Sequence, residues 1–227
     1  MAKGLFITAT GTDVGKTYVT ALIVKKLREA GLSAGYYKAA LSGAELRDEA
    51  WIPGDADYVK QIAGLPDSYD QLVSYIYKAA VSPHLAAQME GDPVELSRVQ
   101  ADYEKAAQRY EYITAEGSGG IVCPIRWDDE QQLMLTDIIK ALELPILIVA
   151  NAALGSINAV VLTVEYARQK GIPVKGIVLN DFHQGDPMEE DNRKMMEALT
   201  GVPVVALVFH GDTELNMDAD ALRQLYE

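Results

Sequence analysis

The chain has 227 residues, of which 49% are hydrophobic and 23% charged. These proportions exclude a disordered or low-complexity chain and fit one domain spanning residues 1–227. Acidic residues outnumber basic ones 33 to 20, and the net charge of −13 argues against nucleic acid or an anionic membrane as partner.

Cys123 is the single cysteine, so an intramolecular disulfide is excluded, as is typical of a cytoplasmic protein. We expect no targeting segment, because the sequence turns polar at Thr8. We also expect no membrane span, since the most apolar stretch, residues 144–150, is far too short.

Short apolar runs alternate with helix-period segments along the chain. We predict strands at residues 5–9, 34–38, 112–115, 145–150, 174–179 and 204–208. The runs are almost continuously apolar, as expected of parallel strands covered on both faces. Amphipathic stripes predict helices around residues 19–27, 96–110 and 157–167.

Gly31 and Gly171 stand where two of these helices should end, and Ser156 stands where one should be capped. Residues 41–77 form the longest irregular segment, in which we expect loops and one short helix near residues 55–63. The alternation of strands and helices predicts an α/β fold of three layers, with a parallel sheet between helices. Ligands then bind at the carboxyl ends of the strands.

The strongest motif, Thr-Ala-Thr-Gly-Thr-Asp-Val-Gly-Lys-Thr at residues 8–17, lies between the first strand and the first helix. A turn here directs backbone N–H groups and a helix N-terminus at one point, which suits a triphosphate. Lys16 would reach the outer phosphates, and the Thr17 hydroxyl would bind Mg²⁺. The literal P-loop pattern is not met, because Thr10 replaces its glycine and Gly11 comes one residue late. An ordinary strand-to-helix turn is the alternative.

Acidic residues near strand ends are candidates for further Mg²⁺ ligands. Glu116 follows the third predicted strand and precedes Gly-Ser-Gly-Gly at residues 117–120, where small residues let the backbone pass close to a ligand. A solvated glutamate in a turn is the alternative. Asp55 and Asp57 are two further candidates at a helix start, where simple capping explains them equally well.

Other strand ends carry candidates for substrate and base recognition. Lys38 ends the second strand, and its ammonium could lie over a phosphoryl group or a substrate carboxylate; otherwise it is a surface lysine. Residues 154–158 open a helix whose free N–H groups form either an anion site or an ordinary capped start. Asn180 and Asp181 could read a nucleobase edge, although a turn is the usual role of such a pair.

In their order and spacing, these segments resemble the dethiobiotin synthetase family from Thr8 to about Gly211. The phosphate loop of that family is one residue longer than the usual P-loop, which accounts for the misfit. Residues 12–17 match its Thr-Glu-Val-Gly-Lys-Thr with Asp13 in place of Glu, and residues 37–43 resemble its Lys-Pro-Val-x-Ser-Gly without the proline. Residues 82–84, 116–120, 154–158 and 180–181 match as well.

The resemblance implies a P-loop NTPase-like fold with about seven mostly parallel strands, a homodimer, and ATP with Mg²⁺ as cofactors. It implies Thr17, Asp55 and Glu116 as metal ligands, which favours Asp55 over Asp57. The implied nucleotide site comprises Thr12, Asp13, Val14, Gly15, Lys16, Thr17, Asp55, Glu116, Gly117, Ser118, Gly119, Asn180, Phe209 and Gly211. The family tends to carry proline where this chain has Phe209.

The implied reaction joins 7,8-diaminononanoate and carbon dioxide into dethiobiotin, and ATP is converted to ADP and phosphate. A carbamate oxygen attacks the γ-phosphate, and the neighbouring amine then closes a cyclic urea as phosphate leaves. The implied catalytic residues are Lys38, Lys16 and Thr12. The implied substrate contacts are Lys38, Ser42, Leu154, Gly155, Ser156, Ile157 and Asn158. The last five would hold the substrate carboxylate that lies far from the reacting amines, across the dimer interface.

Two other classes of protein stay open. A partition-type ATPase switch carries an extra lysine early in the phosphate loop, whereas residues 9–14 contain none. A small-molecule kinase, or a ligase domain on the same core, usually closes an arginine-rich lid, whereas the arginines here form no cluster in sequence. His84 is interpreted as a first-turn residue of a helix that begins at Pro83.

Overall fold

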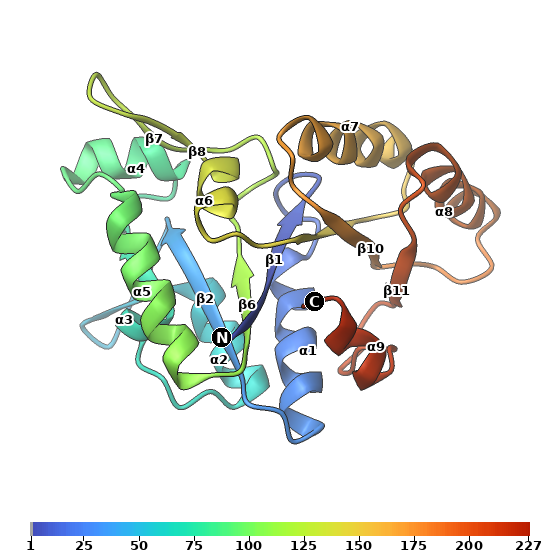
Figure 1. Ribbon diagram of the computed structural model, residues 1–227, viewed down its shortest axis with the longest axis horizontal. Coiled ribbons are helices and arrows are strands. Elements are labelled where there is room, and N and C mark those ends of the chain that lie inside the picture. Colours follow the sequence, from blue (N-terminus) through green and yellow to red (C-terminus); the bar gives the residue numbers. More distant parts are fainter. Residues whose placement is uncertain (1) are drawn as a thin grey trace.

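The computed structural model describes residues 2–227, which form a central parallel sheet between two layers of helices (Figure 1). Within these residues the sheet has seven strands in the order β11-β10-β9-β1-β6-β2-β5. Their bounds are β1 (Lys3–Ala9), β2 (Ala34–Leu41), β5 (Val73–Ile76), β6 (Tyr112–Glu116), β9 (Ile146–Ala150), β10 (Val174–Asn180) and β11 (Val204–Val208). Every neighbouring pair is parallel, as the apolar runs predict.

Side chains that alternate along the strands divide the core between the two faces. In β1, Leu5 and Ile7 pack with Leu22 of α1, whereas Phe6 packs on the opposite face with Ile138 of α6 and Val164 of α7. This alternation requires a helical layer on each side of the sheet. The helices are α1 (Lys16–Glu29), α2 (Gly54–Ala63), α3 (Tyr69–Leu72), α4 (Pro83–Glu90), α5 (Leu96–Arg109), α6 (Leu135–Ala141), α7 (Ser156–Gln169), α8 (Pro187–Thr200) and α9 (Ala219–Gln224).

The expectation of an irregular segment at residues 41–77 is wrong. The segment contains the hairpin of β3 (Glu45–Arg47) and β4 (Ala50–Ile52), then α2, α3 and the edge strand β5. The helix expected near residues 55–63 is present as α2. A second hairpin, β7 (Pro124–Trp127) with β8 (Gln132–Met134), was also not predicted. Strands of three or four residues are too short to show a clear hydrophobic period.

The start of α7 differs from the prediction as well. Gly155, with φ of 89°, takes the N-cap position, and Ser156 is the first helical residue. Ser156 Oγ is buried and has no hydrogen-bond partner among residues 2–227. Ser156 is therefore not a helix cap.

The parallel register brings the carboxyl ends of the central strands to one edge of the sheet. Lys38 of β2 pairs with Glu116 of β6, and Ile7 of β1 pairs with the same glutamate from the other side. The loop after β1 and Asn180 at the end of β10 reach the same edge. In residues 2–227, we find no helix that is long and apolar enough to cross a membrane.

Candidate functional site

The loop between β1 and α1 has the backbone geometry of an anion-binding turn. Asp13 and Gly15 adopt positive φ angles of 60° and 86°, and Gly15 is the N-cap of α1. A Cβ atom at Gly15 would lie 2.1 Å from Asn180 Nδ2, so glycine is required for space as well as for conformation. The first N–H groups of α1 therefore point into the turn, where a phosphate can accept from them.

A buried glutamate lies beside this loop. Glu116 is 1% exposed, and its Oε1 accepts hydrogen bonds from Thr17 Oγ1 (2.9 Å) and Lys38 Nζ (2.9 Å). Lys16 Nζ lies 3.6 Å from the same oxygen, and Tyr36 OH donates to the other carboxylate oxygen, Oε2 (3.1 Å). Two ammonium groups, two hydroxyls and a carboxylate thus meet at the end of β6.

Lys38 connects this glutamate to a second carboxylate. Its ammonium, on a side chain 2% exposed, donates to Asp55 Oδ2 (2.7 Å) and to the Gly117 carbonyl (3.1 Å) as well as to Glu116. Burial disfavours the charge of Lys38, but Glu116 and Asp55 outweigh burial and raise its pKa. Lys38 is therefore a charged, fixed cation and not a surface lysine.

The pKa values of Lys16 and Asp55 are both lowered, which disfavours the charge of the lysine and favours the charge of the aspartate. Burial, together with the nearby charge of Lys38, lowers the pKa of Lys16. Burial alone would raise the pKa of Asp55, but Lys38 and Lys16 lower it overall. Asp55 is thus held as a carboxylate, and an anion near Lys16 would favour its protonated form.

A cavity of about 390 Å³ opens above these groups. Its lining residues are Thr12, Asp13, Gly15, Lys16, Thr17, Tyr18, Lys38, Leu41, Ser42, Asp55, Ser118 and Gly119. The structure thus brings together most residues that the sequence analysis assigned to phosphate, metal and reacting groups. Asp57 lies elsewhere, because its carboxylate binds Arg47, Gln61 and Tyr69.

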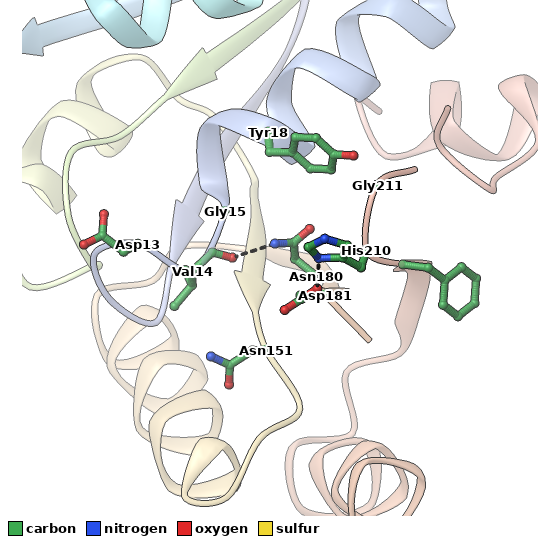
Figure 2. Close-up of a pocket in the computed structure, with 10 residues that line it drawn as sticks. Asp13, Val14, Gly15, Tyr18, Asn151, Asn180, Asp181, His210 and Gly211 are labelled. Carbon is green, nitrogen blue, oxygen red and sulfur yellow. Dashed lines mark hydrogen bonds and ion pairs between the residues drawn. The ribbon is translucent and has the colours of Figure 1, made fainter. Parts of the chain in front are cut away.

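A second cavity, of about 430 Å³, adjoins the first, since Asp13, Gly15 and Tyr18 line both. Figure 2 shows its side chains around Asn180, whose Nδ2 donates to the Val14 carbonyl at 3.2 Å. The full lining is Asp13, Val14, Gly15, Tyr18, Asn151, Asn180, Asp181, Phe209, His210 and Gly211. The volume and position suit a nucleobase beyond a triphosphate.

Five expected substrate contacts lie apart from both cavities. Among the described residues, the cavity linings include none of Leu154, Gly155, Ser156, Ile157 and Asn158. Leu154 is 88% exposed. Within one copy, the start of α7 therefore does not contribute to the cavity above Lys38.

Several residues of the site were not found from the sequence. Tyr36 is one, although its two-residue spacing from Lys38 places both side chains on the same face of β2. Tyr18 follows directly after Thr17. Asn151 follows the end of β9, a position that marks ligand residues in parallel sheets.

The donor set at Thr17, Asp55 and Glu116 fits Mg²⁺. A single ammonium group, that of Lys38, reaches both carboxylates, and Thr17 Oγ1 binds one of them, so the three oxygen donors converge. Hard oxygen ligands in small number, completed by water and phosphate, are what Mg²⁺ prefers. Across residues 2–227 there is no cluster of three or more histidine, cysteine or acidic side chains that would hold a metal by itself.

The fold and the loop geometry define the class of protein as a P-loop NTPase. A family model described as an AAA domain matches residues 3–210. The MinC:MinD cell division complex of Aquifex aeolicus superposes with a TM-score of 0.58 at 15% identity, covering 98% of this chain and 86% of that one. A ParA family ATPase from Chlorobium tepidum superposes with a TM-score of 0.54 at 16% identity, covering 99% and 88%.

Closer sequence relatives narrow the class to one family. An ATP-dependent dethiobiotin synthetase of Brachyspira hyodysenteriae is 51% identical over 228 residues, with both chains fully covered. Another from Clostridium botulinum is 46% identical over 227 residues, covering 100% of this chain and 99% of the relative. The chain belongs to the ATP-dependent dethiobiotin synthetase family, which confirms the resemblance and disfavours the switch and kinase alternatives.

Proposed function

We propose that this chain joins 7,8-diaminononanoate and carbon dioxide into the cyclic urea dethiobiotin, with conversion of ATP to ADP and phosphate. The supporting observation is the buried cluster at the carboxyl edge, in a chain of this family. Lys16 and Lys38 converge on one oxygen of Glu116, Oε1, beside the phosphate loop. Among the residues described, the cavity lining provides fixed cations but no cysteine and no histidine that could activate a hydroxyl, which suits a reaction between bound substrates.

The triphosphate is assigned to the loop that precedes α1. Backbone N–H groups from Thr12 to Thr17 would bind the phosphates, and Lys16 would reach the outer ones. The base is assigned to the second cavity. Because Asn180 donates to Val14 through Nδ2, its Oδ1 is left to accept from the exocyclic amino group of adenine, with Phe209 and Gly211 beside it.

Magnesium would be held by Thr17, Asp55 and Glu116. When bound there, the ion would neutralise charge on the phosphate oxygens. Glu116 is fixed by its neighbours before any ligand arrives, because both of its oxygens already accept hydrogen bonds. Gly117, Ser118 and Gly119 follow it and bring the backbone close to the ligand, and Ser118 Oγ is itself anchored on the Ala40 carbonyl (2.8 Å).

Lys38 is assigned to the reacting groups. The carbamate and the γ-phosphate are both anionic, so a cation fixed between them lowers the barrier to their approach. Thr12 and Ser42 line the same cavity and would orient the diamine and its carbamate. Such fixed positions convert an encounter in solution into a reaction within one complex.

The far carboxylate of the substrate is assigned to the α7 start of a second copy in a homodimer. The free N–H groups of this helix start favour an anion. Ser156 is the first helical residue, so the N–H groups of Ile157 and Asn158 have no acceptor within the helix. The exposed Leu154 fits a contact surface. The acidic composition and single cysteine are consistent with a cytoplasmic enzyme.

The test is a reaction containing the protein, 7,8-diaminononanoate, bicarbonate, ATP and Mg²⁺, followed by mass spectrometry and ADP assay. We expect one ADP for each cyclic urea and almost no ADP when the diamine is left out. ADP formation that is equal with and without the diamine would instead favour a nucleotide switch. Light scattering at the same concentration should give twice the chain mass of 24.7 kDa.

A further inference from the structure

Tyr36 is a buried residue that contacts the site from the core side, through Glu116. It lies in β2, is fully buried, and donates its hydroxyl hydrogen to Glu116 Oε2 at 3.1 Å. Among the residues described, neither cavity lining includes Tyr36. It therefore reaches the cavity only through Glu116.

The two oxygens of Glu116 have different surroundings. Oε1 accepts hydrogen bonds from Thr17 and Lys38, both of which line the cavity of about 390 Å³ above the phosphate loop. Within residues 2–227, the one hydrogen bond to Oε2 comes from Tyr36. The carboxylate is thus oriented, with one oxygen toward the cavity and the other toward the core.

The sheet register explains why Tyr36 can hold this orientation. Lys38 pairs with Glu116 and Tyr36 pairs with Thr114, so Tyr36 is the diagonal neighbour of Glu116 on the adjacent strand. Its ring belongs to a core cluster with Val24 of α1 and other buried apolar side chains. Because the ring is packed on all sides, its hydroxyl is a fixed point for the carboxylate.

We infer that Tyr36 is a positioning residue, whose hydroxyl fixes Glu116 so that Oε1 faces Thr17, Lys38 and the divalent cation. This inference deepens the proposed function and rests on it, since it takes Glu116 as a ligand of that cation. Mutation of a group that hydrogen-bonds to a metal-ligating side chain typically lowers metal affinity or activity about 10–100-fold. Without the hydroxyl, the carboxylate can rotate and Oε1 loses its fixed direction.

The neighbouring residue provides a matched control. Tyr37 is also buried, at 1% exposure, but its side chain lies on the other face of β2. Its hydroxyl bonds to Ser74 Oγ (2.8 Å) and the Val99 carbonyl (3.0 Å), away from the cluster. Tyr36→Phe and Tyr37→Phe each remove one buried, hydrogen-bonded hydroxyl, and only the first touches Glu116.

The experiment measures binding of Mn²⁺, as a spectroscopic substitute for Mg²⁺, in the presence of a non-hydrolysable ATP analogue. The electron paramagnetic resonance signal of free Mn²⁺ gives the dissociation constant. We expect about a 10–100-fold weaker Mn²⁺ affinity for Tyr36→Phe and less than about a twofold change for Tyr37→Phe. Both variants should lose thermal stability to a similar extent, which shows that stability alone does not set the metal affinity.

A double-mutant cycle tests whether the effect of Tyr36→Phe on Mn²⁺ affinity acts through Glu116. In a Glu116→Gln background, adding Tyr36→Phe should weaken Mn²⁺ binding by less than about twofold, because the oriented carboxylate is already gone. Equal Mn²⁺ affinity of the two phenylalanine variants, or a full additional loss in the Glu116→Gln background, would overturn the inference.

Failure of the proposed function gives a different result. If the wild-type chain binds Mn²⁺ and the analogue with the expected Tyr36 effect but makes no cyclic urea, the proposed reaction is wrong and the positioning role stands. If the wild type makes the cyclic urea and Tyr36→Phe has wild-type Mn²⁺ affinity and wild-type Mg²⁺ dependence of turnover, Tyr36 has no positioning role.

Discussion

Replacement of Lys38 tests the assignment of the reacting groups. Lys38→Met keeps most of the apolar stem and removes an ammonium that donates to Asp55, Glu116 and the Gly117 carbonyl. Breaking a buried ion pair costs about 3–5 kcal/mol, and the half-exposed Asp55 side chain places the expected loss near the lower end. A loss of about 3 kcal/mol lowers the melting temperature of a chain of this size by about 6–12 °C.

The expected effect on turnover is separate from the effect on stability. Removal of one fixed donor from a site of developing charge raises the barrier by about 3–4 kcal/mol, or about 10²–10³-fold in turnover. Binding of an ATP analogue, measured by calorimetry at a temperature where the variant is folded, should stay close to wild type. Lys16→Met is the matched comparison, and it should lose both turnover and nucleotide affinity. A folded Lys38→Met variant with near-normal turnover would refute the role of Lys38.

Three further variants or measurements test other parts of the site. Gly15→Ala should weaken ATP binding and lower the stability by at least about 1–2 kcal/mol, because φ is positive and the new Cβ would lie 2.1 Å from Asn180 Nδ2. Unchanged ATP affinity by calorimetry would contradict this geometry. Asp55→Asn should raise the Mg²⁺ concentration for half-maximal turnover at least about tenfold, whereas Asp57→Asn should not; equal shifts would remove Asp55 from the metal site. Burial raises the pKa of Cys123 to about 11. The native protein should therefore react slowly with iodoacetamide at pH 8 and faster as the pH approaches 11. Fast labelling at pH 7 would contradict the burial of this thiol.

The central strands could be predicted from the sequence because each is a nearly continuous apolar run. The edge strand β5 could not, since Val-Ser-Tyr-Ile alternates in polarity over four residues and follows a segment broken by Pro53, Gly64 and Pro66. The two hairpins are equally short. Their positions depend on tertiary contacts, such as the ion pair between Arg47 and Asp57, which no local pattern reveals.

The cluster of charges could be predicted in part, because strand order and strand ends place Lys38 and Glu116 at one edge. Position alone left Asp55 and Asp57 equivalent as candidates; the family resemblance favours Asp55, and the side-chain contacts separate the two. Tyr36 was missed because a buried tyrosine in a strand resembles ordinary core. Its role depends on which carboxylate oxygen it contacts, and that is a property of the folded chain.

The origin of the oxygen atoms in the released phosphate tests most directly whether a carbamate attacks the γ-phosphate at this site. The wild-type chain would be mixed with the diamine, ATP, Mg²⁺ and freshly dissolved carbon dioxide labelled with ¹⁸O, and quenched before the label exchanges with water. We expect one labelled oxygen in each released phosphate, formed together with dethiobiotin. Dethiobiotin formed with unlabelled phosphate would contradict the attack of a carbamate oxygen.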